Sequence, residues 1–276
     1  MDISSTTVDL PGALKGYWAH PAKVNSPLPG MLLIQEVWGV DGHIRDVAHR
    51  LAAAGYAVLA PDLYCAGGAR PAALGEDRLE RAKRFMDGVP ASAWSGLMDP
   101  QQREETLNKL GAPDRQGLRE TFGEICNPSW EAQVERFGNK LTPLLAWVRS
   151  QSSCRDRKVG ALGFCVGGTL AGRLATEDAA LGSAVMFYGA PPAAQAIPKI
   201  QCPVLGFYGE DDARLMPQLP AFERAMKDNQ KSLEVRVYPK TPHAFFNDTR
   251  SSYRVEAARD AWARTLGFLT STLAGD

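Results

Sequence analysis

The feature that most constrains the fold of this chain is a series of short apolar runs that alternate with longer amphipathic segments. Near-continuous apolar runs of about four to eight residues are typical of strands buried on both faces of a parallel sheet. Their alternation with helical patterns predicts an α/β fold, a mostly parallel, doubly wound sheet with flanking helices. The expected strands are 31–34, 56–60, 159–163, 184–188, 204–208 and 233–238, the expected helices are 43–54, 131–149, 167–178, 218–229 and 253–272, and 5–19 is expected to add an antiparallel pair at one edge.

One connection is too long for a simple crossover. About 90 residues separate Tyr64 from the strand that begins at Val159, whereas a crossover needs only about a dozen or more. We therefore expect a single domain over residues 1–276 with a helical insertion at about 75–130, which either caps the site or merely elaborates the surface. The helical patterns within the connection lie at 76–87, 101–110 and 115–125.

Composition and charge argue against several function classes. The chain has 31 basic and 31 acidic residues and no basic run, so nothing draws it to nucleic acid or to an anionic membrane. It shows no signal peptide pattern and no apolar stretch near the ~20 residues of a membrane span. The five cysteines are odd in number and form no C-x-x-C pair, which indicates free thiols in a reducing, cytoplasmic compartment.

The segment Gly163-Phe164-Cys165-Val166-Gly167 joins an expected strand to an expected helix. This G-x-C-x-G pattern is that of a nucleophile elbow with cysteine in place of serine. Glycines are expected at 163 and 167 because side chains there would collide with the nucleophile on its tight turn. The N-terminus of the following helix would favour a thiolate and later an oxyanion. The alternative, a buried structural cysteine beside a packing turn, does not explain the residues that follow downstream.

His243 is the candidate base because it follows the last expected strand, and open α/β sheets hold their sites at the carboxyl ends of strands. His20, His43 and His49 are expected at the surface or on helices. The acid should lie between nucleophile and histidine in the chain. Asp211 and Asp212 both follow the strand at 204–208 and both satisfy this spacing.

Two rival enzyme classes lack support. Glutamine amidotransferases with a cysteine elbow carry a glutamate two residues after the histidine, where this chain has Phe245. Zinc hydrolases need an H-E-x-x-H motif or a cluster of Cys and His, and the sequence has neither, so no metal site is predicted.

Five segments together resemble the dienelactone hydrolase (carboxymethylenebutenolidase) family of α/β-hydrolases. They appear in the family order and span most of the chain, and their combination is specific although each alone is not. They are Q-E-V-W-G-V at 35–40, A-P-D-L-Y at 60–64, G-F-C-V-G-G at 163–168, Y-G-E-D-D-A-R at 208–214 and H-A-F-F-N-D at 243–248.

The resemblance implies the α/β-hydrolase fold and hydrolysis of a small ester or lactone through a thioester on Cys165, with no cofactor. It points to Asp212, rather than Asp211, as the residue that orients His243. It also implies that Glu36 lies beside the thiol and helps to control its ionisation. The backbone N–H groups of Val37 and Val166 would form the oxyanion hole. Without the resemblance, Glu36 would be read as a surface loop carboxylate.

The sequence departs from the family where anionic substrates are bound. Well-known members have an arginine four residues after the histidine, and this chain has Asn247 there. Arg103 is a loose match for a second substrate arginine. We therefore expect only weak preference for substrates that bear a carboxylate. Trp38 and Tyr188 lie near strand ends and are candidates to line the pocket, with aromatic core packing as the alternative.

Three other functions remain open at this stage. The same residues could serve a broader carboxylesterase or thioesterase, or the fold could belong to a non-hydrolytic binding protein, which would have no use for elbow, acid and base together. A thiol redox enzyme is disfavoured because no second cysteine lies near Cys165 in sequence. The expected partner is a small-molecule ester or lactone, and the expected assembly is a monomer or small homo-oligomer.

Overall fold

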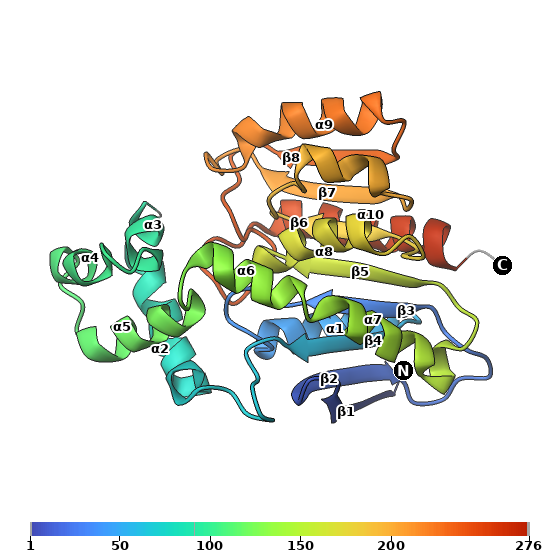
Figure 1. Ribbon diagram of the computed structural model, residues 1–276, viewed down its shortest axis with the longest axis horizontal. Coiled ribbons are helices and arrows are strands. Elements are labelled where there is room, and N and C mark those ends of the chain that lie inside the picture. Colours follow the sequence, from blue (N-terminus) through green and yellow to red (C-terminus); the bar gives the residue numbers. More distant parts are fainter. Residues whose placement is uncertain (1, 91, 275–276) are drawn as a thin grey trace.

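The computed structural model describes residues 2–90 and 92–274. Its strands form one sheet in the order β1-β2-β4-β3-β5-β6-β7-β8, in which β3 to β8 run parallel and β1 and β2 add an antiparallel edge (Figure 1). The α/β-hydrolase fold expected from the sequence is therefore present. The strands are β1 (Ile3–Leu10), β2 (Leu14–Pro21), β3 (Gly30–Ile34), β4 (Ala57–Asp62), β5 (Val159–Phe164), β6 (Ala184–Phe187), β7 (Val204–Gly209) and β8 (Leu233–Tyr238).

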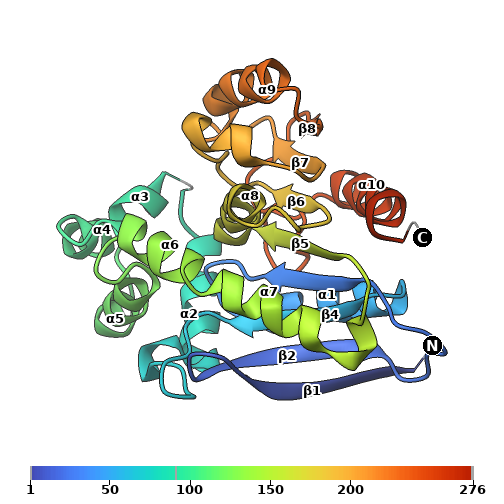
Figure 2. The same ribbon diagram turned by 45° about the vertical axis from the view of Figure 1, so that its right-hand side comes forward.

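Helices cover both faces of the sheet (Figure 2). On one face, α1 (Gly42–Ala53) buries Ile44, Val47 and Leu51, which recur at helical spacing. Asp41 caps this helix by accepting from the N–H of Ile44 at 3.0 Å. Separate apolar clusters form on the two faces, so the parallel strands are buried on both sides. The first face carries α1 (Gly42–Ala53) and α10 (Val255–Leu273), and the second carries α7 (Leu141–Ser150), α8 (Val166–Glu177) and α9 (Leu219–Asp228).

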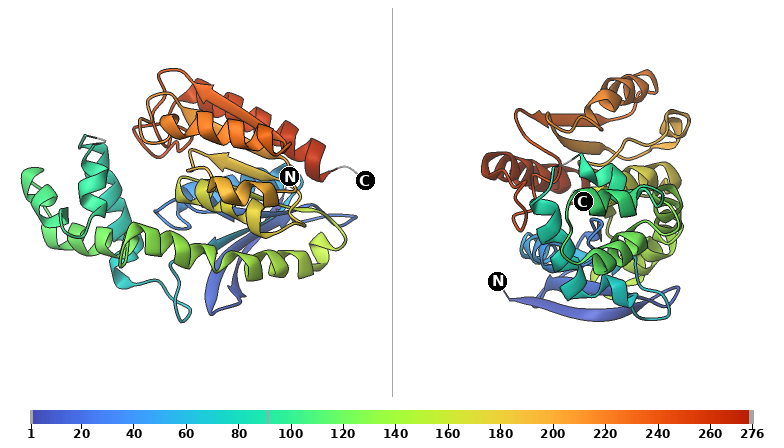
Figure 3. Two further views of the ribbon diagram at one scale, coloured as in Figure 1. Left: turned by 45° about the horizontal axis from the view of Figure 1, so that its top comes forward. Right: turned by 90° about the vertical axis from the view of Figure 1, so that its left-hand side faces the viewer.

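The long connection after β4 forms a group of short helices that projects from the side of the sheet (Figure 3). Leu79, Leu107 and Phe122 are buried within it, and this apolar interior is continuous with the sheet core through Trp38 and Tyr64. None of the helices in the described part of the chain is long and apolar enough to cross a membrane. The helices of the connection are α2 (Glu76–Asp87), α3 (Ala93–Met98), α4 (Arg103–Lys109), α5 (Arg115–Ile125) and α6 (Trp130–Gly138).

The single helix expected at 131–149 is wrong, because the structure has two helices there. α6 ends at Gly138 and α7 begins at Leu141. Pro143 explains the break, since proline is tolerated in the first turn of a helix but would lose a hydrogen bond and clash in the interior of a continuous one. The break lets α6 turn away from the sheet toward the carboxyl ends of the strands.

Two ion pairs connect α2 to the loops at the carboxyl edge of the sheet. The Lys83 ammonium lies 2.8 Å from Asp41, in the loop that follows β3, and Lys83 is buried. The Arg250 guanidinium, in the loop region after β8, lies 2.9 Å from Asp87 at the end of α2. Removing one partner of a buried ion pair destabilises a protein more than removing one partner of an exposed pair. The helical group is therefore docked on the two loops that carry Glu36 and His243.

Candidate active site

Cys165 occupies the sharp turn between β5 and α8. Its backbone has φ 56° and ψ −117°, a region that side chains rarely adopt and that costs conformational energy. The N–H of Cys165 donates to the carbonyl of Phe187 at 3.0 Å, which ties the turn to the neighbouring strand β6. Cys165 is partly exposed, whereas Cys65, Cys126, Cys154 and Cys202 are buried.

The glycines of the elbow are required by backbone packing rather than by the nucleophile itself. A Cβ at Gly163 would lie 2.1 Å from the carbonyl oxygen of Gly167, and a Cβ at Gly167 would lie 2.3 Å from the carbonyl oxygen of Ile34 in β3. The sequence reasoning placed the collision at Cys165, but the nearest atoms belong to the opposite arm of the turn and to β3. The elbow therefore packs backbone on backbone, which fixes the position of the turn that carries Cys165.

His243 and Asp212 meet across two strand-end loops. Nδ1 of His243 lies 2.6 Å from Oδ2 of Asp212. The loops approach closely because Gly209 has no side chain: a Cβ there would lie 2.2 Å from the carbonyl oxygen of Thr241. Asp211 instead donates its N–H to that carbonyl at 3.0 Å, and its side chain is exposed. The structure thus places Asp212, and not Asp211, against the imidazole.

The charges around His243 favour its protonated form. Burial alone would lower the pKa of the imidazole, but the negative charge of the Cys165 thiolate and the hydrogen bonds to Asp212 and Cys165 raise that pKa to about 9. For Asp212, burial opposes ionisation, yet the hydrogen bond and charge of His243 and the charge of Arg214 hold the pKa below its ordinary value. The imidazole of His243 therefore lies between the carboxylate of Asp212 and the sulfur of Cys165 and interacts with both.

Glu36 is buried and is not the surface carboxylate of the alternative reading. The hydroxyl of Tyr188 donates to Oε1 at 3.1 Å, and Nδ2 of Asn247 donates to Oε2 at 2.7 Å. Within the part of the chain that the structure describes, Glu36 forms no hydrogen bond with Cys165. Tyr188 lines the same cavity as Cys165, so the carboxylate is connected to the surroundings of the thiol through this tyrosine.

Val37 and Val166, the residues predicted to form an oxyanion hole, follow the ends of the adjacent strands β3 and β5. The N–H of Gly39 donates to the carbonyl of Glu36 at 3.2 Å, which orients the peptide group that carries the N–H of Val37. Val166 is the first residue of α8, where N–H groups have no acceptor within the helix. These two N–H groups could stabilise negative charge on an oxygen bound beside Cys165.

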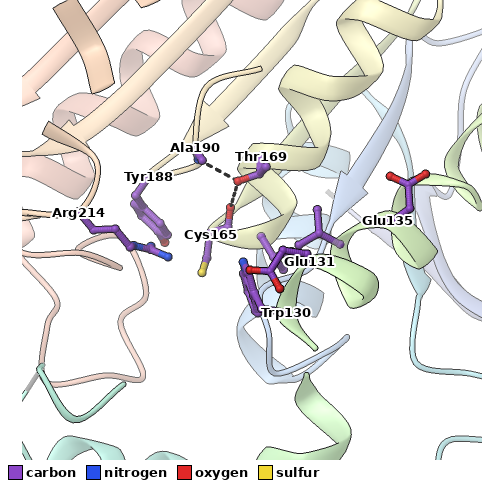
Figure 4. Close-up of a pocket in the computed structure, with 10 residues that line it drawn as sticks. Trp130, Glu131, Glu135, Cys165, Thr169, Tyr188, Ala190 and Arg214 are labelled. Carbon is purple, nitrogen blue, oxygen red and sulfur yellow. Dashed lines mark hydrogen bonds between the residues drawn. The ribbon is translucent and has the colours of Figure 1, made fainter. Parts of the chain in front are cut away.

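A cavity of about 260 Å³ opens beside the sulfur (Figure 4). Its volume lies slightly below the ~300–1,000 Å³ typical of ligand pockets, which suits a small substrate. Helix α6, from the second part of the long connection, closes the other side. The lining includes Cys165, Val166, Tyr188 and Arg214 from the strand ends, and Trp130 and Val134 from α6.

Two of the predicted pocket residues lie elsewhere. Trp38 is buried, with its ring centroid 6.2 Å from that of Trp94 in the helical group. Arg103 is also buried; its guanidinium donates to the carbonyl of Leu97 at 2.8 Å and to the sulfur of Cys126 at 2.8 Å. Arg103 donates to carbonyl groups at the end of α3 and does not line the cavity, so its assignment as a substrate arginine is wrong.

Sequence reasoning did not single out Trp130, Val134 or Arg214. Trp130 and Val134 lie in the long connection, where no motif indicates which helix turns toward the strand ends. Arg214 stands within the quoted segment at 208–214, so the signal was present, but that segment was used only to choose the acid. Asn247 was noted because it replaces a family arginine. Its hydrogen bond to Glu36 could not be predicted, because the two residues are far apart in sequence and meet only in the fold.

Comparison with known proteins gives a consistent family. Residues 14–273 match the model of the "Dienelactone hydrolase family". A Saccharolobus solfataricus protein called "Putative carboxymethylenebutenolidase" is 34% identical over 255 residues, with 91% of this chain and 92% of the relative covered. A Klebsiella pneumoniae structure called "Putative Dienelactone Hydrolase" has a TM-score of 0.70 and 25% identity, covering 98% of this chain and 99% of that one. The dienelactone hydrolase of Anabaena variabilis, at 18% identity, shares the fold with a TM-score of 0.61, covering 99% and 100% of the two chains.

Proposed function

This chain belongs to the dienelactone hydrolase family and is a hydrolase of carboxylic ester bonds, and from that premise we propose that it cleaves small esters or lactones with Cys165 as nucleophile. His243 is the acid and base of the reaction, and Asp212 orients it. The observation that carries the proposal is the hydrogen-bonded series from Asp212 through His243 to the partly exposed sulfur on a strained turn.

In the first half-reaction the substrate carbonyl lies between the sulfur and the N–H groups of Val37 and Val166. The Cys165 thiolate forms a bond to the carbonyl carbon, and the carbonyl electron pair moves to oxygen, where the two N–H groups stabilise it. When this oxyanion collapses, the carbon–oxygen bond to the leaving group breaks. The His243 imidazolium gives its proton to the departing alkoxide, leaving a thioester and a neutral imidazole.

In the second half-reaction water replaces the alcohol. Neutral His243 takes a proton from the water as the hydroxide adds to the thioester carbon. Collapse of the second oxyanion breaks the carbon–sulfur bond, so the carboxylic acid leaves and the thiolate–imidazolium pair is restored. In a lactone the alcohol formed in the first half-reaction remains attached to the acyl group and leaves with it.

Asp212 and Glu36 support this chemistry without contacting the reacting carbon. Asp212 accepts from Nδ1 of His243, so the other ring nitrogen, Nε2, is directed to the sulfur and substrate. We propose that buried Glu36 acts on the thiol through Tyr188, its hydrogen-bond donor, which shares the cavity with Cys165. Asn247 holds the second carboxylate oxygen of Glu36 and fixes its orientation.

The other cysteines argue against a thiol redox function. Burial raises the pKa of the Cys154 and Cys202 thiols to about 11, and it also raises the pKa of Cys65 and Cys126. A protonated, buried thiol is a poor partner for disulfide exchange. All five cysteines are free, so no disulfide partner is prepared for Cys165. A pure binding protein would not need a strained cysteine with a base and an acid aligned on it.

Steady-state hydrolysis of a neutral aryl acetate tests the proposal. Cys165→Ala should lower kcat by roughly 10⁴-fold or more, because it removes only the attacking atom. Cys154→Ala is the matched control, since this cysteine is buried away from the cavity, and it should keep activity. Full activity in Cys165→Ala, or loss of activity in the control with a native circular dichroism spectrum, would contradict the assignment.

A further inference from the structure

His43 is a buried polar residue that the proposed chemistry does not use. It is the second residue of α1, and its side chain is fully buried. Within residues 2–90 and 92–274 neither of its ring nitrogens forms a hydrogen bond. Burying a polar group without a hydrogen bond lowers the stability of a protein, whereas an apolar ring would fill the same space without this cost. The nitrogens of His43 therefore call for an explanation other than packing.

An ion-pair contact reaches His43 from the loop between β8 and α10, which also carries His243. Nδ1 of His43 lies 3.7 Å from Oδ1 of Asp248, whose side chain is half-exposed. This distance is too long for a direct hydrogen bond. A carboxylate nevertheless attracts an N–H group across it, and the attraction is stronger inside a protein than in water. The contact therefore joins α1 to the loop after β8.

A second contact joins the same two segments, and this one reaches the active site. Glu36 lies in the loop that leads from β3 into α1, and Asn247 directly precedes Asp248. Nδ2 of Asn247 donates to Oε2 of Glu36 at 2.7 Å, and both side chains are buried. Oδ1 of Asn247 accepts from the N–H of Thr249 at 3.0 Å and from its hydroxyl at 2.7 Å, which leaves the amide nitrogen for Glu36. The turn at 247–249 therefore sets the direction of this hydrogen bond.

Aromatic packing places the ring of His43 against the nucleophile elbow. Its centroid lies 5.5 Å from that of Phe164, the residue before Cys165, and 6.1 Å from that of Phe246. Both contacts are edge-to-face, and the two phenylalanines stack on each other with centroids 5.3 Å apart. The elbow, α1 and the loop after β8 therefore meet at one imidazole.

We propose that His43 is a positioning residue: by attracting Asp248 it holds the turn at 247–249, so that Asn247 stays hydrogen-bonded to Glu36. The ring of His43 supplies packing, and its nitrogens supply the contact with the turn. This inference rests on the proposed function, in which Glu36 acts on the thiol. His43 is outside the cavity lining and acts only through other residues, so it is not a catalytic residue.

The kinetic test separates the nitrogens of His43 from its ring. His43→Phe keeps an aromatic ring but removes both nitrogens, and Asp248→Asn removes the charge of the half-exposed partner. Each should lower kcat for phenyl acetate about threefold to tenfold and change KM less than about twofold, because the cavity itself is intact. The double variant should lose no more than the single variants, since both changes remove one contact.

Two further variants control this comparison. His43→Gln retains an N–H group that can approach Asp248 and should recover part of kcat. His49→Phe, at an exposed position of the same helix, is the matched control and should change neither constant. Circular dichroism checks that the variants are folded. If His43→Phe does not fold, Asp248→Asn alone decides: wild-type kcat in that variant would overturn the inference.

A background variant shows whether His43 acts through Glu36. In Glu36→Gln, which itself should have a lower kcat, adding His43→Phe should cause no further loss. The same loss as in the wild-type background would overturn the inference, because His43 would then support the fold in general. Wild-type kcat in Glu36→Gln would overturn it as well.

Amide NMR of nitrogen-labelled protein gives a readout that does not depend on catalysis. The side-chain amide signals of Asn247 are assigned by their loss in Asn247→Ala. They should move in His43→Phe and Asp248→Asn but not in His49→Phe, and the same shifts are expected in a Cys165→Ala background. Failure of the proposed chemistry would appear separately, as hydrolysis by Cys165→Ala. Unmoved Asn247 signals in His43→Phe and Asp248→Asn would overturn the inference whatever their rates, because the turn would not depend on His43.

Discussion

The two walls of the cavity are built in different ways. The strand-end wall, which carries Cys165, Asp212 and His243, is held by contacts between backbones that leave no room for a Cβ at three glycines. The helical wall is α6, whose Trp130 and Val134 face the cavity from a helix held on α8 by the Arg173–Glu135 ion pair. The positions of the reacting side chains therefore depend on backbone packing at the strand ends. The shape of the substrate pocket depends on side chains of α6, which can be substituted without disturbing that packing.

After the nucleophile itself, the acid should show the largest effect on the strand-end wall. Asp212→Asn removes the carboxylate that orients His243 and should lower kcat by roughly 10²–10⁴-fold, less than in a serine triad if the cysteine ionises easily. Asp211→Asn, its matched neighbour, should stay within about tenfold of wild type because its side chain is exposed. If Asp211→Asn lowered kcat more than Asp212→Asn, the acid would be Asp211. If both variants lowered kcat only slightly, neither aspartate would belong to the triad.

Backbone packing at the elbow should appear as a loss of stability. Gly167→Ala places a Cβ 2.3 Å from the carbonyl of Ile34, and should lower the free energy of unfolding by about 3 kcal/mol or more. Gly267→Ala on α10, where a Cβ meets nothing within 4 Å, should raise it by up to about 1 kcal/mol. Urea unfolding measures both variants. Equal stability of the two variants would show that close backbone packing at Gly167 does not hold the strand-end wall in place.

The charge coupling on the strand-end wall predicts how His243 titrates. Its pKa is raised to about 9, so its contribution to stability is fully present below the unfolded-state pKa near 6.5 and is lost as pH rises through about 9. NMR titration of the imidazole should show this midpoint in wild type. Cys165→Ala removes the largest raising contribution and should lower the midpoint, whereas Cys154→Ala should not. An unchanged midpoint in Cys165→Ala would mean that the sulfur and imidazole are not coupled.

The helical wall should give the smallest effects. Trp130→Ala removes apolar surface that faces the substrate and should raise KM for a neutral aryl ester about threefold to tenfold, with kcat changed little. Trp147→Ala is the control, because this half-buried tryptophan packs against Trp18 at the sheet edge, away from the cavity. A large fall in kcat for Trp130→Ala at unchanged KM would instead connect α6 to the chemistry and weaken the distinction between the walls.

The sequence predicted the strand-end wall better than the helical wall, for physical reasons. Buried parallel strands require apolar runs, and an elbow requires glycines around its nucleophile, so the sheet and Cys165 leave strong local patterns. The edge pair at 5–19 and the helices at 76–87 and 115–125 were also predicted from local sequence patterns and are present in the structure. Short α3 spans only residues 93–98, too few for a helical period to show.

Pocket residues leave no comparable pattern. Arg103 was a loose match for an arginine that follows the P-D-L-Y motif in the family, but in the structure its side chain points into the helical group and donates to the carbonyls of Leu97 and Met98. Trp38 faces Trp94 for the same reason. Arg214 faces the cavity because the loop after β7 is fixed on the His243 loop through Gly209, a contact between segments that are far apart in sequence.

Capture of the acyl-enzyme tests the central claim most directly. The enzyme would be mixed with an excess of an aryl ester, quenched with acid before the steady state is reached, and mapped by peptide mass spectrometry. The account predicts one acyl group per chain, carried by the peptide that contains Cys165 and absent from Cys165→Ala. An acyl group on a different residue, or rapid release of phenol with Cys165 unmodified at every quench time, would contradict the assignment of Cys165 as the nucleophile.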